Sequence, residues 1–161
     1  MRRMEILAHA RGRSAADVYP LLCDFERWPR YSDAIRAVSV TARGGDRLAS
    51  TWEVAFRQGI LRWTEEDRLE PGSQSIHFRQ TSGDAGHFAG TWAVSDEPQG
   101  CRIRFTAEFD LGIPTMSDLL DPIAEEAMRD NIHSILTGLL GGAVEFASSD
   151  GGLPGTMDSG E

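Results

Sequence analysis

The chain has 161 residues, a length that suits one domain with a substantial core but not two domains of ordinary size. Its formal net charge of −9 argues against binding to nucleic acid, because a hold on phosphate backbones requires a basic surface. No apolar run reaches the ~20 residues that cross a bilayer and the N-terminus lacks the apolar core of a secretion signal, so we expect a cytoplasmic protein without a membrane partner.

The first predicted elements are one strand and two short helices. Residues 3–12 can run as a strand. Ser14 followed by Asp17 resembles a capping box, which predicts a short helix that ends near Phe25. In the segment DFERWPRYSD, Pro29 requires an extended residue before it, and this favours a second short helix or a turn.

From Ile35 to Asp110 the apolar residues recur with a period of two, which is typical of half-buried antiparallel strands. The clearest run has the following residues on one face: Leu48, Ser50, Trp52, Val54 and Phe56. Turn signals such as Gly44-Gly45-Asp46 and Pro71-Gly72 separate the runs. The sequence therefore predicts consecutive hairpins with one face in contact with water.

After Pro114 the apolar residues take up helical spacing, from Leu119 to Leu140, and predict an amphipathic helix of about thirty residues. The segment 148–161 contains few side chains that a core could bury, so we expect a disordered tail. Residues 1–147 are then a single domain.

This order of elements predicts an α+β fold in which a seven-stranded, curved antiparallel sheet has its helices on one face. The last helix can bury its apolar side only against the concave face of that sheet. One straight helix does not fill a strongly curved sheet, so we expect an apolar ligand cavity between them. The arrangement is a helix-grip fold, and we expect the function to reside in the cavity.

The most function-like group of charges is Glu65, Glu66, Asp67 and Arg68, because alternation must turn some of these side chains toward the concave face. An inward Arg68 would hold an enolate or ketone oxygen, and Glu65 and Asp67 would be its acidic partners in proton transfer. The alternative is an exposed cross-strand ion pair, which contributes little to stability.

Three further positions could take part in catalysis or line the entrance to the cavity. His87 is expected on the outward side or at the rim, where it is either a general base or an ordinary surface histidine. Tyr31 and Asp33 follow the short helices and lie either at the cavity entrance or in a plain surface loop.

The predicted cavity has polar and apolar candidate residues. Asn131 interrupts the apolar stripe of the long helix, and Gln80 lies on the inward face of a strand, so each binds a ligand carbonyl or forms a structural hydrogen bond. The apolar candidates for ligand binding are ones that could equally belong to the core: Trp52, Trp63, Phe78, Phe88, Trp92 and Met128.

Four strings resemble the START-related superfamily, which includes bacterial polyketide aromatase/cyclases and coenzyme Q-binding proteins: DFERWPRYSDAI, WEVAFRQGILRWTEEDRLE, IHFRQTSGDAGHFAGTWAV and FTAEFDLGIP. The likeness covers about residues 3–145. In the aromatase/cyclases an Arg of a W-x(3)-E-R type strand is the clearest polar group of the cavity. The comparable stretch here runs from Trp63 to Arg68 and is one residue longer.

The resemblance implies a cofactor-independent cyclase or aromatase of secondary metabolism that acts on a poly-β-ketone, with an acyl carrier protein as the expected partner. The alternative is a non-catalytic binding protein for a quinone, a lipid or an aromatic natural product. A third hypothesis is a protein-interaction module, whose cavity should be filled by side chains. No GxSxG, HExxH, P-loop or GxGxxG motif is present, so we predict no metal and no cofactor.

Overall fold

The computed structural model describes residues 1–113 and 117–147, so the predicted disorder of residues 148–161 falls outside the described part of the chain. The chain begins with strand β1, Arg2–Arg11. Helix α1, Ala15–Cys23, and the short 3-10 helix η1, Phe25–Arg30, come next. The Ser14 side chain accepts a hydrogen bond from the Asp17 backbone N–H at 3.1 Å, which caps α1 as the sequence predicts.

Six strands follow in antiparallel hairpins: β2 Ile35–Gly44, β3 Arg47–Phe56, β4 Gly59–Glu70, β5 Ser75–Gly83, β6 His87–Glu97 and β7 Gly100–Asp110. The C-terminal elements are helix α2, Ser117–Leu140, the 3-10 turn η2, Gly141–Ala143, and strand β8, Val144–Phe146. Within the described residues, no helix is both long and apolar enough to span a bilayer.

The strands form one sheet in the order β2-β3-β4-β5-β6-β7-β1-β8. The prediction of seven strands was wrong, because β8 adds an eighth that pairs with Ala8–Ala10 of β1. Helix α2 has 24 residues rather than about thirty, since Gly141, at φ 69°, ends it and turns the chain into β8. A strand of three residues is too short for its alternation to be visible in the sequence.

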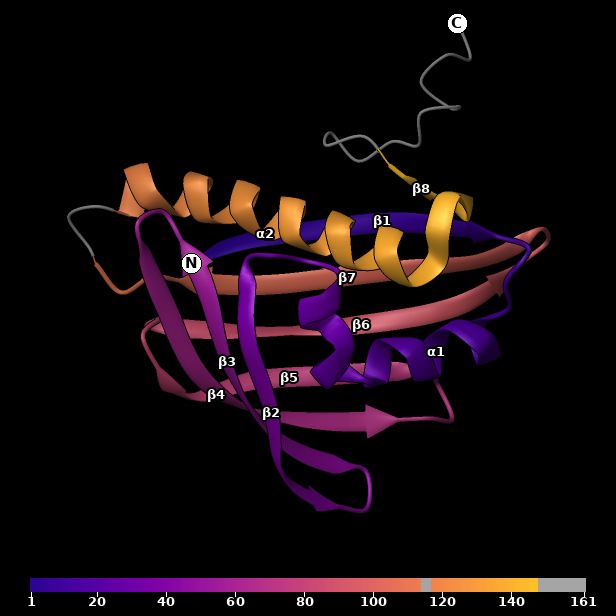
Figure 1. The fold of residues 1–161 in the computed structure, drawn as a ribbon, viewed down its shortest axis with the longest axis horizontal. Helices are drawn as coiled ribbons and strands as arrows, with labels where there is room; N and C mark the ends of the chain where they lie inside the picture. The colour runs from indigo at the N-terminus through magenta and orange to yellow at the C-terminus, as the bar shows by residue number, and fades with distance from the viewer. Residues whose placement is uncertain (114–116, 148–161) are drawn as a thin grey trace, which may run out of the picture.

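The sheet bends around α2, as Figure 1 shows: β2, β3 and β4 cross the direction of β5, β6, β7 and β1. Helices α1 and η1 lie on the same side of the sheet as α2. The inner side of α2 is buried through Ile132, Ile135 and Leu136. The predicted helix-grip architecture, an α+β fold with a long C-terminal helix in the concave face, is confirmed.

Two glycines allow close approaches that shape the interior. A Cβ atom at Gly90 would lie 2.6 Å from Cζ of Phe78, so the missing side chain makes room for that ring. A Cβ atom at Gly138 of α2 would lie 2.6 Å from Cγ of Tyr31, so the loop after η1 can pack directly on the helix.

Candidate functional site

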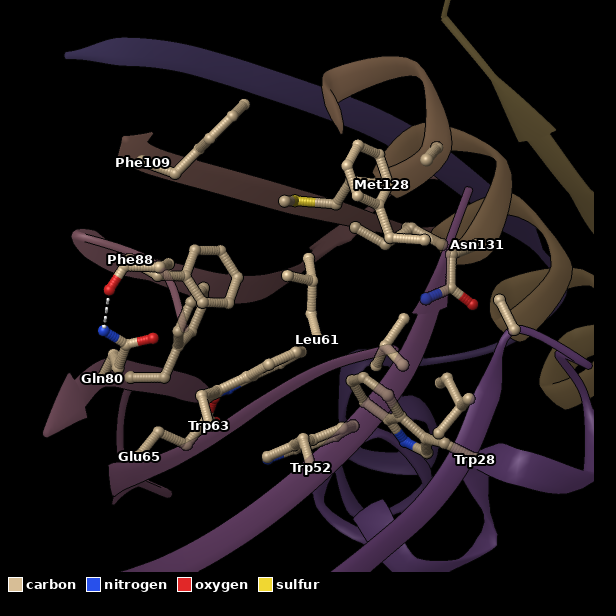
Figure 2. Close-up of a pocket in the computed structure, with 18 of the residues that line it drawn as sticks. Trp28, Trp52, Leu61, Trp63, Glu65, Gln80, Phe88, Phe109, Met128 and Asn131 are labelled. Carbon is tan, nitrogen blue, oxygen red and sulfur yellow. Dashed lines mark hydrogen bonds between the residues drawn. The ribbon is translucent and has the colours of Figure 1, made fainter. Parts of the chain in front are cut away.

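A cavity of about 180 Å³ lies between the concave face of the sheet and α2. Its wall is mainly apolar and includes side chains from η1, β3, β4, β5, β6 and α2, which Figure 2 shows in close-up. The hypothesis of a protein-interaction module predicts a cavity filled by side chains. The cavity is open, which argues against that hypothesis. The volume exceeds that of the ~150 Å³ engineered cavity that takes up benzene.

Aromatic rings form the floor and one side of the cavity. Trp52 and Trp63 stack with their ring planes 4° apart and their centroids at 5.9 Å. Phe88 meets Trp63 edge-on at 5.6 Å, and Trp28 meets Trp52 edge-on at 5.4 Å. These contacts fix the rings against one another, so the wall offers preformed flat surfaces to a planar ligand.

Two carboxyl groups lie among these rings. Strand β4 directs Trp63, Glu65 and Asp67 toward the concave face because side chains two residues apart share a face. Glu65 is 5% exposed and Asp67 is fully buried. Both line the cavity. Their role in proton transfer stays a prediction.

Hydrogen bonds from neighbouring side chains orient this carboxyl pair. Trp63 Nε1 donates to Glu65 Oε1 at 2.8 Å. Ser50 Oγ donates to Asp67 Oδ2 at 2.5 Å and itself accepts from Trp52 Nε1 at 2.9 Å. Asp67 Oδ1 is buried without a donor as long as both carboxyl groups are ionised. A proton on Glu65 would supply that donor.

Burial raises the pKa of Glu65 well above its ordinary value, and the hydrogen bond to Asp67 and repulsion from it act in the same direction. Burial also raises the pKa of Asp67, although hydrogen bonds from Glu65 and Ser50 oppose this effect. Both directions favour a protonated carboxyl group, and repulsion between the two groups opposes the loss of the second proton from the pair.

Two amides complete the polar part of the wall. Gln80 Nε2 donates to the Ala85 backbone carbonyl at 2.8 Å, which leaves its Oε1 buried and without a partner. Asn131, on α2, accepts a hydrogen bond at Oδ1 from the Ser32 hydroxyl. Figure 2 shows Glu65 and Gln80 on one side of the cavity and Asn131 on the other, with Leu61 between them.

Nearly all of the predicted ligand-binding residues line the cavity: Trp52, Trp63, Phe78, Gln80, Phe88, Trp92, Met128 and Asn131. Tyr31 is the exception, because its ring packs on Gly138 of α2 instead. Asp33 is exposed, as a surface loop residue would be. Placement in the wall does not test binding, so the role of these residues in holding a ligand stays a prediction.

The catalytic role suggested for Arg68 requires an inward side chain, and the structure contradicts that orientation. Its side chain is 43% exposed on the convex face of the sheet, where it forms an ion pair with Glu70. The physical reason is parity: Trp63 points inward, so Glu65 and Asp67 do as well, and Arg68 has the opposite direction. The alternative reading, an exposed surface ion pair, describes its position better, although Glu70 lies on the same strand β4 and not on a neighbouring one.

His87 also lies away from the cavity. Its Nε2 is 3.0 Å from Glu108 Oε2 on the convex face, and the side chain is 35% exposed. The sequence predicts an outward or rim position for His87, and of the two readings the ordinary surface histidine agrees with this geometry. A general base acting on a cavity ligand therefore has to come from another residue.

Sequence reasoning did not single out Ser50, Ser32 or Leu61 as parts of the site. Ser50 lies on the apolar face of its predicted strand, between Leu48 and Trp52. A serine at such a position indicates a polar partner in the interior of the protein. Leu61 shares the parity of Trp63. Within the described residues, no group of three or more His, Cys, Asp or Glu side chains could hold a metal ion.

The sequence matches the model of a family described as polyketide cyclase/dehydrase and lipid transport over residues 12–136. No curated protein sequence matches the chain. Among solved structures, TTHA0849 from Thermus thermophilus is 28% identical, with a TM-score of 0.78 over 86% of this chain and 94% of that one.

Two more distant structures share the fold. The Zhui aromatase/cyclase from Streptomyces sp. R1128 is 18% identical, with a TM-score of 0.75 over 86% of this chain and 93% of that one. A START superfamily protein from Mycobacterium smegmatis is 15% identical, with a TM-score of 0.72 over 86% and 96% of the two chains. The START-like fold expected from the resemblance is therefore confirmed.

Proposed function

Since this chain belongs to the polyketide cyclase/dehydrase and lipid transport family, we propose that it is a cofactor-independent cyclase or aromatase of secondary metabolism. Its reaction is aldol ring closure and dehydration of a poly-β-ketone intermediate inside the cavity. The observation that carries the proposal is the pair of buried carboxyl groups, Glu65 and Asp67, at the wall of an otherwise apolar cavity.

Glu65 serves as the general acid of this proposal, because burial raises the pKa of its carboxyl group well above the ordinary value and so favours the protonated form. Asp67 serves as the base and is held by Ser50 through a hydrogen bond. When two carboxyl groups lie in different environments, their pKa values differ. One group can then act as the acid and the other as the base. Such an acid–base pair contributes typically 10²–10⁴-fold to a rate, as an order of magnitude.

Ring closure and dehydration use the same two groups. In ring closure, Asp67 takes a proton from the carbon next to one carbonyl, that carbon forms a bond to a second carbonyl carbon, and Glu65 protonates the second carbonyl oxygen. In dehydration, Asp67 again takes a proton next to the carbonyl, the electron pair forms the C=C bond, and the β-hydroxyl group leaves as water with the proton of Glu65. Proton transfer from Asp67 to Glu65 then restores the pair, so neither step requires an oxidant or a reductant.

The size of the cavity limits the part of the substrate that it encloses. A volume of about 180 Å³ lies below the ~300 Å³ at which pockets for drug-sized ligands begin. We therefore propose that the cavity encloses a unit of one or two rings, with any remaining chain toward solvent. The flat surfaces of Trp52 and Trp63 favour the planar product of aromatisation.

The direct experiment uses 8a-hydroxyoctahydronaphthalen-2(1H)-one, a two-ring β-hydroxyketone that loses water to give a conjugated enone. The rise in ultraviolet absorbance of the enone measures dehydration. The wild type should exceed the buffer rate, and Glu65→Gln should lose about 10²–10⁴-fold of that enhancement because the amide cannot give up a proton as an acid. Arg68→Ala, on the other face of the same strand, is the matched control and should retain the wild-type rate.

A Glu65→Gln protein that is correctly folded and as fast as the wild type would contradict the proposed acid. A wild type that binds the product enone but does not accelerate its formation would favour the second candidate, a non-catalytic carrier for a hydrophobic ligand. The observation that favours this second candidate is the mainly apolar cavity wall. Delivery by an acyl carrier protein and a cytoplasmic location are further parts of the proposal.

A further inference from the structure

Ser32 connects the loop after η1 to helix α2. Its hydroxyl group donates to Asn131 Oδ1, across 99 positions of the sequence. Ser32 is 6% exposed and Asn131 is partly buried, so this hydrogen bond is shielded from most of the solvent. The Ser32 backbone carbonyl also accepts from the Ile35 N–H at 3.2 Å, which closes the turn into β2. Ser32 is thus held at both its backbone and its side chain.

The neighbouring residue fixes this loop against the helix. The Tyr31 ring occupies the space that a side chain at Gly138 would take, so the loop cannot slide along α2 without losing that contact. Tyr31 N–H donates to the Trp28 carbonyl at 2.9 Å, which ties the loop to η1 as well. The Ser32 hydroxyl is therefore a fixed donor rather than a mobile one.

A fixed donor at Oδ1 determines what Asn131 presents to the cavity. An amide has an acceptor oxygen and a donor NH₂ group on opposite sides, so occupation of Oδ1 by Ser32 turns Nδ2 toward the interior. Figure 2 shows the Asn131 nitrogen on the side of Leu61 and the oxygen on the far side. Within the described residues, no hydrogen bond uses Nδ2 as a donor, and Asn131 belongs to the cavity wall.

We infer that Ser32 is a positioning residue that orients the Asn131 amide so that Nδ2 donates to a carbonyl oxygen of the cavity ligand. The ligand class is then a cyclic ketone whose oxygen faces Asn131 while its apolar ring lies beside Leu61. The inference rests on the proposed function only in placing the ligand in this cavity, and it requires no reaction. If Ser32 and Asn131 merely held loop and helix together, ligand choice would not depend on them.

The test compares 1-tetralone with tetralin, two ligands that share both rings and differ at the carbonyl group. Dissociation constants come from the quenching of tryptophan fluorescence, since Trp52 and Trp63 line the cavity. The wild type should prefer 1-tetralone by about fivefold, the effect of one neutral hydrogen bond of ~1 kcal/mol. Asn131→Leu and Ser32→Ala should bring this preference close to one and leave the affinity for tetralin unchanged.

Two further variants separate positioning from stability. Ser32→Thr keeps the hydroxyl group and should keep the preference. Arg68→Ala should keep it too, because the Arg68 side chain lies on the convex face and does not line the cavity. A Ser32→Ala protein that still prefers 1-tetralone, or an Asn131→Leu protein that does so, would overturn the inference. Loss of the preference in Arg68→Ala alone would overturn it as well.

The outcomes of this test and of the dehydration assay are distinguishable. A preference that depends on Ser32 and Asn131, in a protein that does not dehydrate the hydroxyketone, supports the positioning role and contradicts the proposed cyclase. Dehydration that depends on Glu65, with no preference for 1-tetralone, supports the cyclase and overturns the role of Ser32.

Discussion

Glu65 is the residue whose chemistry the fold changes most. In an unfolded chain its carboxyl group ionises near the ordinary pKa of 4.5, whereas burial keeps it protonated to much higher pH in the folded protein. The folded state therefore binds more protons than the unfolded state above pH 4.5, and stability falls as pH rises from there through the raised pKa. Asp67 contributes in the same direction, because its pKa is also raised.

Glu65→Gln should therefore be more stable than the wild type at pH 7. The amide keeps an acceptor for Trp63 Nε1 and offers a permanent donor to Asp67 Oδ1, and it avoids the cost of keeping a proton bound. We expect Tm to rise by a few degrees, since ~1 kcal/mol corresponds to about 2–4 °C in a chain of this size. Thermal unfolding at pH 4, 7 and 9 is the measurement, and a Glu65→Gln protein less stable at pH 7 would refute the buried proton.

Arg68→Ala should change little, although the family resemblance assigns its position a role in the cavity. The side chain is 43% exposed and pairs with Glu70, and an exposed ion pair is worth only about 0–1 kcal/mol. Binding of 1-tetralone should stay within twofold of the wild type, about 0.4 kcal/mol. A tenfold weaker affinity, with unchanged Tm, would mean that Arg68 reaches the ligand after all.

Strand β4 illustrates how far the sequence alone could predict the site. Alternation required that some of its charges face inward, but both sets, Glu65 with Asp67 and Glu66 with Arg68, contain charged side chains. The choice between the two sets depends on Trp63, whose side chain lies on the inward face and shares that face with Glu65 and Asp67. The hydrogen bonds from Ser50 and Trp63 depend on strand register and rotamers, which the sequence pattern does not specify.

Contacts between distant elements were harder to predict than the elements themselves. The sheet and its long helix followed from periods of two and 3.6, which are local properties of the chain. Ser32 and Asn131 are 99 positions apart, and each is an ordinary polar residue in its own segment. Their contact exists because Gly138 lets the loop after η1 approach α2, which no local pattern reveals.

Gly138→Ala should uncouple this loop from α2. Alanine favours a helix by about 0.5–1 kcal/mol over glycine, but its Cβ atom would clash with the Tyr31 ring. We expect the clash to prevail, so that Tm falls and the preference for 1-tetralone over tetralin decreases together with it. Gly142→Ala is a matched control, because no atom lies within 4 Å of a Cβ there. Equal Tm in both variants would contradict the tight packing of Tyr31.

On the scale of the whole molecule, the fold keeps space open that a core would normally fill. Protein interiors are close-packed, so a cavity of about 180 Å³ forgoes contacts that side chains could make. The curvature of the sheet around α2 maintains this space, and the stacked indoles of Trp52 and Trp63 stiffen its wall. The open cavity therefore lowers the stability of the fold but leaves space for a ligand.

Leu61→Trp should close the cavity, because Leu61 lies in the middle of the space that Figure 2 shows. The larger side chain occupies the volume that a two-ring ligand needs, so tetralin should bind more than about tenfold more weakly, ~1.4 kcal/mol. Arg62→Trp, the exposed neighbour on the same strand, is the control and should bind tetralin as the wild type does. Unchanged binding by folded Leu61→Trp would place the ligand elsewhere.

A ¹³C NMR titration of the glutamate and aspartate carboxyl groups shows directly which of them keep a proton in the folded protein. Burial raises the pKa of Glu65 and of Asp67, so we expect the cavity pair to lose its last proton at a higher pH than the exposed carboxyl groups do. We predict one glutamate carboxyl signal that still reports a protonated group at pH 7 and that disappears in Glu65→Gln. If every carboxyl signal of the folded wild type had already moved to its ionised position at pH 6, the buried acid would not exist and the proposed chemistry would lose its proton donor.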